Sequence, residues 1–191
     1  MGRLYPVLTR ELREFVEAAP LFFTGTAPLS ADGRVNVSPK GGTDTLAVLD
    51  DSTVAYLDLI GSGSETIAHL RENGRITLMF CSFTRRPKIL RLYGRGRIVL
   101  PDTAEWAGLI GHFGHHPIPR SVVVVALERI ADSCGFTVPV MELVNERDLQ
   151  DKWGERKSPQ ELEEYMRLKN SLSIDGLPAR DHQPVAARGQ G

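Results

Sequence analysis

Residues 54–80 read VAYLDLIGSGSETIAHLRENGRITLMF, and this stretch decides the fold that the sequence predicts. An apolar strand, Val54–Ile60, leads into a Gly/Ser loop at 61–66, a helix that ends at Asn73-Gly74, and a second apolar strand at 75–83. A glycine-rich loop that opens a helix offers amides without partners, which can bind an anion such as a phosphate. The loop lacks the GxGxxG spacing and the Walker lysine. The alternative is therefore that Ser64 only caps the helix and the glycines only turn the chain.

Composition narrows the class of protein. The chain has 191 residues, 25% of them charged, and a net charge of -1, which argues against a dedicated nucleic-acid binder. No apolar run reaches the roughly 18 residues of a membrane span, and the first residues contain no signal-peptide core, so we expect a cytoplasmic protein without membrane contact. Cys81 and Cys134 lie in apolar stretches and are expected to be buried thiols rather than a disulfide.

The first 50 residues predict a helix and then a hairpin. Apolar residues at helical spacing predict a helix over 9–19. Leu21–Ala27 and Arg34–Ser38 are expected to pair as a hairpin, because Ala31-Asp32-Gly33 can turn the chain between them. The segment 38–42 is predicted to be a loop with Lys40 at its tip.

Beyond residue 84 the pattern continues with strands and few helices. In the strand 89–100, Leu90 and Leu92 face one side while Arg91 and Tyr93 face the other. A helix is expected over 102–113, with a capping box at its start, and the β-prone run that begins at Ser121 predicts a further strand. Polar helices follow over 145–157 and from Ser158 to about residue 172.

Strands at hairpin spacing with few crossover helices predict an antiparallel β-barrel flanked by helices. We expect a barrel domain over 1–144, a helical extension over 145–179 that packs on the barrel or on a dimer partner, and a disordered tail over 180–191.

The order of these motifs resembles the pyridoxamine 5′-phosphate oxidase family. The resemblance rests on Arg34-Val35-Asn36-Val37, Lys40, Tyr56-Leu57-Asp58, the Ser/Gly loop, Asn73 and the run 88–94. It covers roughly residues 10 to 132. It implies an FMN-binding split β-barrel that forms a homodimer with the flavin at the subunit interface.

The resemblance also implies which residues bind the cofactor. Residues 34–40 would lie along the flavin and its phosphate, the loop 62–66 would hold the phosphate, and a neighbouring strand would add an arginine. The expected cofactor-binding residues are Arg34, Val37, Ser38, Lys40, Asp58, Ser62, Gly63, Ser64, Thr66 and Arg91.

Two departures separate this chain from the vitamin B6 oxidase itself. The oxidases carry Ser-Arg-Lys in the phosphate loop, whereas this loop has no cation and contains Glu65. They also place a glutamine near the flavin, where this chain aligns Ile89. We therefore expect an uncharacterised branch of the family, an FMN-dependent oxidoreductase acting on a small molecule that the sequence does not name.

Several alternatives remain open. The same barrel could bind the deazaflavin F420, or the protein could be a flavin- or haem-binding storage or sensor protein without enzymatic activity. His112, His115 and His116 could bind a metal, but no carboxylate or cysteine stands at a familiar ligand spacing, so a polar loop is expected and no metal site is assigned. No catalytic acid, base or nucleophile is identified.

Overall fold

The computed structural model describes residues 2–42 and 44–180. Within them it has the following elements: β1 (Leu4–Tyr5), α1 (Arg10–Glu17), β2 (Leu21–Thr26), β3 (Asn36–Gly41), β4 (Leu46–Asp50), β5 (Thr53–Leu59), α2 (Glu65–Asn73), β6 (Arg75–Cys81), β7 (Ile89–Val99), α3 (Trp106–Ile110), β8 (Pro119–Ser133), α4 (Leu149–Glu155) and α5 (Pro159–Lys169).

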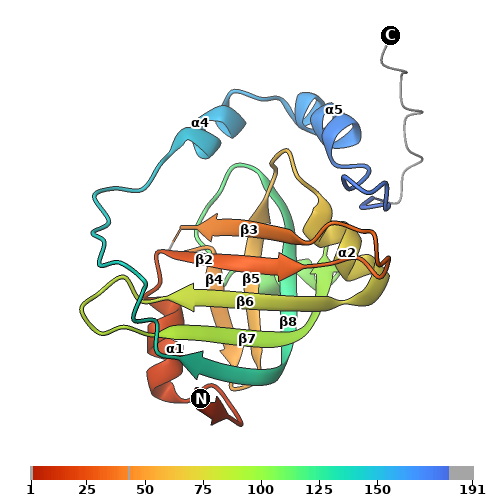
Figure 1. Ribbon diagram of the computed structural model, residues 1–191. Helices are drawn as coiled ribbons and strands as arrows, with labels where there is room; N and C mark the ends of the chain where they lie inside the picture. The colour runs from red at the N-terminus through yellow and green to blue at the C-terminus, as the bar shows by residue number, and fades with distance from the viewer. Residues whose placement is uncertain (1, 43, 181–191) are drawn as a thin grey trace.

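All the strands belong to one antiparallel sheet in the order β3-β2-β6-β7-β8-β5-β4, with β1 added to the far part of β8. β8 pairs with both β7 and β5 over residues 122–126, so it joins the two halves of the sheet. Figure 1 shows β3, β2 and β6 in front of β4 and β5, because the sheet curls back on itself. The expected split β-barrel with flanking helices is confirmed.

The barrel interior is filled by side chains that alternate along the strands. Phe22 stacks on Phe80 with ring centroids 5.4 Å apart and meets the edge of Tyr56 at 5.6 Å. α1 adds the fully buried Leu12 and Val16 to the same core. Each such side chain stabilises the fold by about 1.5–3 kcal/mol, so this interior fixes the strands that position the site.

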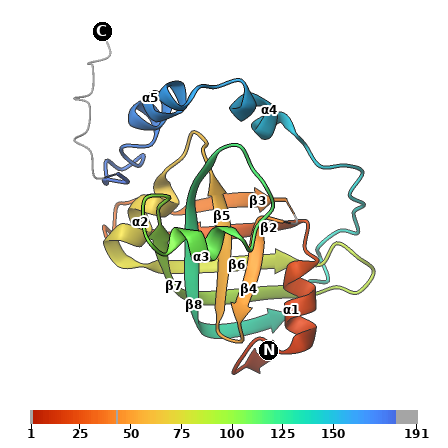
Figure 2. The ribbon, with the colours of Figure 1, turned by 180° about the vertical axis from the view of Figure 1, so that it is seen from behind.

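The helices cover the outside of the barrel. Trp106 and Leu109 of α3 pack on a second apolar cluster formed by β5 and β8, on the side of the molecule that Figure 2 shows. α3 is shorter than the predicted helix 102–113. Its expected cap is absent because the Thr103 hydroxyl donates back to the carbonyl oxygen of Leu100 at 2.7 Å and forms a turn.

Two further sequence expectations are wrong. Lys40 does not lie at a loop tip, because the ladder between β2 and β3 continues through Gly41 and places Lys40 opposite Phe22. Cys134 is exposed rather than buried, since it follows the last residue of β8, whereas Cys81 is half-buried. The capping box at Ser158 and Glu161 is confirmed.

After β8 the chain leaves the barrel as an extended arm, which we define as residues 134–148. The arm passes beside the barrel and leads to α4 and α5, which lie across one end of it (Figures 1 and 2). The expected disordered tail, apart from Arg180, lies outside the described residues. None of the described helices is both long and apolar enough to cross a membrane; the cytoplasmic location stays a prediction.

Candidate functional site

A polar pocket of about 250 Å³ lies between the end of β3, β5 and the start of α2. We call it the site pocket. Asp58 on β5 is 2% exposed at its base and accepts hydrogen bonds from Lys40 Nζ at 2.9 Å and Arg120 Nε at 2.7 Å. A second Arg120 nitrogen donates to the carbonyl oxygen of Gly63 at 2.7 Å, which ties β8 to the Gly/Ser loop.

The charges of this cluster depend on one another. Burial by itself would raise the pKa of Asp58, but the positive charges of Lys40 and Arg120, and the hydrogen bonds that they donate, lower it well below its usual range. Asp58 is therefore ionised at any working pH. It holds both cations at the pocket, where they would otherwise be free to turn into solvent.

The start of α2 is already in contact with the C-terminal segment. Ser64 Oγ donates to the carbonyl oxygen of Leu172 at 3.0 Å instead of capping the helix. The Glu65 carboxylate accepts from the amides of Ser64 at 3.1 Å and Ile174 at 3.2 Å. Glu65 thus places its own negative charge on amides that a bound phosphate could have used.

A chain of polar side chains runs from the pocket into the barrel. Asn36 Nδ2 donates to the hydroxyl oxygens of Thr66 at 3.1 Å and Thr26 at 3.2 Å. Thr26 in turn contacts His69 Nδ1 at 3.0 Å. Burial lowers the pKa of His69, and its Nε2 has no partner among the described residues, so the imidazole is neutral at pH 7. This chain fixes the Thr66 hydroxyl at the pocket wall.

The structure brings six of the ten predicted cofactor-binding residues together in the lining of the site pocket: Ser38, Lys40, Asp58, Gly63, Ser64 and Thr66. The other four lie elsewhere. Arg34 forms an ion pair with Asp175, and Ser62 does not line the pocket. Val37 and Arg91 sit at the outward positions of β3 and β7, on the opposite side of the sheet from Lys40.

The lining residues that sequence reasoning missed include Arg120 and Gln150. Arg120 stands just before the β-prone run that begins at Ser121, and nothing in its neighbourhood marks it as a partner of Asp58, 62 residues earlier. Gln150 comes from α4 and donates to the carbonyl oxygen of Ile60 at 3.0 Å. Both contacts are long-range and depend on the closed barrel, so no local pattern predicts them.

The segment that forms the barrel matches a known family. A family model described as pyridoxamine 5′-phosphate oxidase matches residues 8–134, from just before α1 to just after β8. The chain belongs to the pyridoxamine 5′-phosphate oxidase family. The resemblance inferred from the motifs is thereby confirmed, and the arm, α4 and α5 lie outside the matched residues.

One similar protein supports the assignment to this family, and two solved structures share the fold. The pyridoxamine 5′-phosphate oxidase family protein ustO of Aspergillus flavus is 38% identical over 207 residues, covering 100% of this chain and 82% of that protein. The crystal structure of HupZ from Group A Streptococcus is similar with a TM-score of 0.51, 22% identity and coverage of 70% of this chain and 98% of that chain. A variant of HupZ is similar with a TM-score of 0.52 and 24% identity, and the match covers 66% of this chain and 99% of that chain. These two structures show the fold alone.

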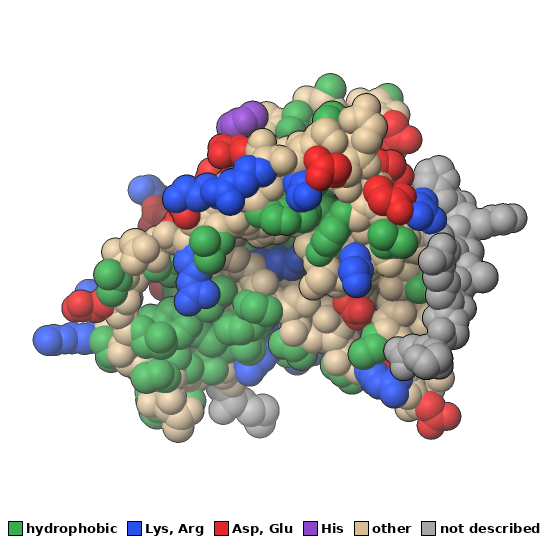
Figure 3. Space-filling view, turned by 90° about the horizontal axis from the view of Figure 1, so that it is seen from above, with side chains coloured by type: hydrophobic (Ala, Val, Ile, Leu, Met, Phe, Trp, Pro, Cys, Tyr) green, Lys and Arg blue, Asp and Glu red, His purple; other side chains and the backbone are tan. Residues whose placement is uncertain are grey.

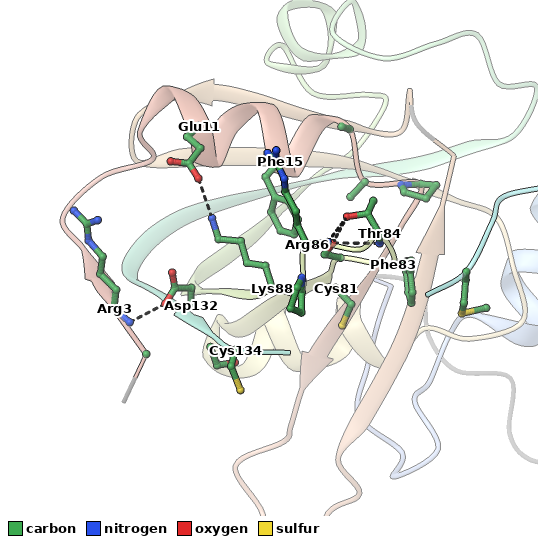
Figure 4. A pocket seen from close by; sticks show the side chains of 18 residues that line it. Arg3, Glu11, Phe15, Cys81, Phe83, Thr84, Arg86, Lys88, Asp132 and Cys134 are labelled. Carbon is green, nitrogen blue, oxygen red and sulfur yellow. Dashed lines mark hydrogen bonds and ion pairs between the residues drawn. The ribbon is translucent and has the colours of Figure 1, made fainter. Parts of the chain in front are cut away.

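Outside the site pocket, this family member has a larger cavity of about 1090 Å³ alongside α1 (Figure 4). Lys88 Nζ lies 5.4 Å from the ring centroid of Phe15 and 3.5 Å from Glu11 Oε1. Cys81 and Cys134 also line the cavity, and burial raises the pKa of the Cys81 thiol. The cavity shares no lining residue with the site pocket, so we do not include it in the candidate site.

The histidine-rich segment shows no metal centre. His116 has Nε2 3.3 Å from Asp44 and Nδ1 3.3 Å from Asp151, so it links the barrel to α4. Within residues 2–42 and 44–180 no group of three or more histidine, cysteine or acidic side chains could hold a metal ion.

Proposed function

We propose that this chain is an FMN-dependent oxidoreductase acting on a small molecule, and that the site pocket binds the phosphate of FMN. The observation that supports the proposal most directly is the donor set of Lys40, Arg120 and Thr66 around one pocket. Bound FMN would supply two-electron transfer through its ring, chemistry that amino-acid side chains do not provide.

The donors at the pocket fit a phosphate. The Lys40 ammonium has three N–H groups and the Arg120 guanidinium has five; their hydrogen bonds to Asp58 and Gly63 leave several of them free among the described residues. The Thr66 hydroxyl accepts from Asn36, so its own hydrogen can be donated. Hydrogen bonds from charged donors to phosphate oxygens are short and strong, so these groups could replace the Arg-Lys pair that the loop lacks.

The residues of the pocket would bind and orient rather than transfer protons. Asp58 is ionised and doubly paired, so it has no proton to give and little basicity to offer. Its part is to hold the two cations at the wall of the pocket. We assign no side chain of this chain as a catalytic acid or base.

We further propose a homodimer with the cofactor at the subunit interface. The outward face of β3, β2, β6 and β7 presents apolar side chains in register: Phe23 stands opposite Pro39 on one side and Met79 on the other, and Met79 stands opposite Arg91. Val37, on the same face, is 65% exposed. Figure 3 shows hydrophobic side chains gathered on the side that faces the reader in Figure 1. A sheet face of this kind fits an isologous interface between two copies.

Two rivals use the same fold. The deazaflavin F420 also carries a phosphate, and the same donors could bind it. Haem would need an accessible imidazole at the cofactor pocket. The exposed His112 and His115 do not line the site pocket, His116 faces two carboxylates, and His69 of α2 is fully buried. No contact in the structure favours haem over a flavin.

The absorbance spectrum of the protein purified in the dark tests the proposal, with the released cofactor identified after acid precipitation. We expect the two-band spectrum of an oxidised flavin and the release of free FMN. A deazaflavin spectrum would show that the cofactor is F420 rather than FMN. A Soret band, or failure of the apo-protein to bind added FMN, would refute the proposal.

A further inference from the structure

A second chamber adjoins the site pocket. It has a volume of about 700 Å³ and lies between the barrel edge and residues 141–151, which belong to the arm and the start of α4. It shares Gly41, Thr45, Leu59 and Gln150 with the site pocket. A ligand in the chamber would therefore lie next to a cofactor whose phosphate occupies the site pocket. We call this cavity the arm chamber.

The wall of the arm chamber is fastened to the barrel at both ends. The amide of Met141 donates to the carbonyl oxygen of Phe83 at 3.0 Å. At the other end, Gln150 donates to Ile60, and Asp151 meets the His116 ring, which also faces Asp44. The chamber is thus bounded by chain that specific contacts hold in place, and its size is typical of a small-molecule site.

The lining combines apolar side chains, some of them exposed, with an acidic rim. Leu21, Phe83, Met141 and Leu143 supply the apolar part. The rim contains the carboxylates of Glu142 and Glu146, which form no ion pair with any described residue, and a single guanidinium, Arg147. Asp44 and Asp151 add two more carboxylates, which His116 faces.

The two cavities therefore differ in charge. At the site pocket Lys40 and Arg120 are balanced by Asp58 and Glu65, whereas carboxylates outnumber cations at the arm chamber. We propose that the arm chamber is the substrate site, and that it accepts an apolar molecule with a neutral or positively charged polar group and rejects a carboxylate. Its role as a substrate site depends on the flavin function proposed above; its role as a binding site does not.

Desolvation strengthens this selection. A carboxylate bound in the chamber would lose part of its hydration against the half-buried Leu21 and Phe83, and Glu142 and Glu146 would repel it. An ammonium or a hydroxyl group at the same place would meet carboxylate oxygens that accept hydrogen bonds. The residues that make this difference lie beyond the segment 8–134 that the family model matches, so the selectivity would be specific to this chain and its close relatives.

Three probes of the same shape test the proposal: benzylamine, benzyl alcohol and benzoate, titrated into the full chain and followed by the amide NMR signals of residues 141–151. The titrations are run without FMN and again with FMN present. We expect benzylamine to shift these signals and to bind at least about 5-fold more tightly than benzoate, as rim charges of this kind allow.

Variants locate the effect. Glu142→Gln combined with Glu146→Gln should reduce the preference for benzylamine to about 2-fold or less, and Leu143→Ser should weaken both benzylamine and benzyl alcohol. Glu14→Gln, an exposed glutamate of α1 that pairs with Arg10, serves as the matched control and should change nothing.

Benzoate binding as tightly as benzylamine, or shifts confined to signals outside residues 141–151, would overturn the proposal. The titrations without FMN test the binding site separately from the proposed flavin function. If FMN fails to bind but benzylamine still binds, the arm chamber is supported as a binding site and the flavin function is refuted. If FMN binds but no probe shifts the amide signals of residues 141–151, only the proposal of the arm chamber is refuted.

Discussion

At the scale of the residue, the site depends on one buried carboxylate. Asp58 has a side chain that is 2% exposed, and it lies between Lys40, 23% exposed, and Arg120, 9% exposed. Removing one partner from a buried ion cluster leaves the others unpaired, and this usually costs far more than the loss of a surface pair. Asp58 should therefore matter for both stability and ligand binding.

Replacing Asp58 by Asn should lower the free energy of unfolding by about 3–5 kcal/mol at pH 7, because two cations lose their counter-charge. The lowered pKa of Asp58 stabilises the fold at neutral pH, and this contribution is lost as the pH falls below the unfolded pKa of about 3.9 towards the folded one. The difference in the free energy of unfolding between wild type and Asp58→Asn should therefore become smaller on acidification. Urea unfolding between pH 7 and pH 3 measures this change.

Asp51 provides the control, because it forms an exposed pair with Arg13. Asp51→Asn should change the stability by less than about 1 kcal/mol. Equal losses for the two variants would show that the cluster around Asp58 is not the anchor that we describe.

Lys40 should serve both the fold and the cofactor. Lys40→Ala is expected to weaken FMN binding by about 10- to 100-fold, the effect of losing one charged hydrogen bond. Because Lys40 lies in β3 and pairs with Asp58, the variant should also be less stable than wild type, measurable by calorimetric titration and thermal unfolding together. Arg10→Ala, which breaks the exposed pair with Glu14 on α1, is the control. Unchanged FMN affinity in Lys40→Ala would mean that the phosphate lies elsewhere.

At the scale of the element, the start of α2 shows how the chain compensates for its unusual loop. The Glu65 carboxylate lines the site pocket and accepts the amides of Ser64 and Ile174, so it joins the helix to the C-terminal segment. A negative charge is favourable at a helix N-terminus, but it opposes a phosphate bound nearby. The two effects predict opposite consequences for stability and for ligand affinity.

Replacing Glu65 by Gln should tighten FMN binding by about 2- to 5-fold, the equivalent of 0.5–1 kcal/mol of relieved repulsion. The same change should loosen the C-terminal segment, seen as faster amide exchange at Ile174. Glu164→Gln, on the exposed side of α5, should do neither. Weaker FMN binding in Glu65→Gln would show that Glu65 supports the ligand rather than opposing it.

Sequence patterns predict the elements that local spacing defines. The alternation of Leu90 and Leu92 with Arg91 in β7 is confirmed because strand geometry imposes a period of two. The capping box at Ser158 is likewise a contact within one turn. The predicted helix 102–113 is mostly turns, because the hydroxyl of Thr103 competes for the Leu100 carbonyl oxygen.

The candidate site was only partly predictable for the opposite reason. The order of the motifs predicted that Lys40, Asp58 and the loop 61–66 belong to one site. This was possible because the family resemblance indicates which distant segments meet in the fold. The ion pair of Asp58 with Arg120 joins β5 to β8, and the contact of Glu65 with Ile174 spans 109 residues. Neither pairing has a local signal, since both arise only when the barrel closes and the C-terminal segment packs on it.

At the scale of the whole molecule, the outward sheet face and the arm are the features that a single copy leaves exposed. Val37 on the edge strand β3 and Val144 on the arm are 65% and 90% exposed. Large exposed apolar side chains on one face are typical of an interface, and obligate homodimers bury about 2,000 Å² or more in total.

Replacing Val37 by Glu should convert the proposed dimer into a monomer at micromolar concentration without unfolding it, because the side chain points away from the core. Sedimentation velocity measures the change, and circular dichroism verifies the fold. Leu168→Glu, at a site on α5 that is 57% exposed, should leave the dimer intact. A monomeric wild type with FMN present would refute the dimer.

The most direct test of the phosphate site is calorimetric titration of stripped protein with FMN and with riboflavin, which lacks the phosphate. The structure predicts that FMN binds about 10- to 100-fold more tightly than riboflavin, as charged hydrogen bonds from Lys40 and Arg120 require. In Lys40→Ala the ratio of the affinities for FMN and riboflavin should be smaller than in wild type. Equal affinities for FMN and riboflavin in wild type would contradict the assignment of the site pocket to the flavin phosphate.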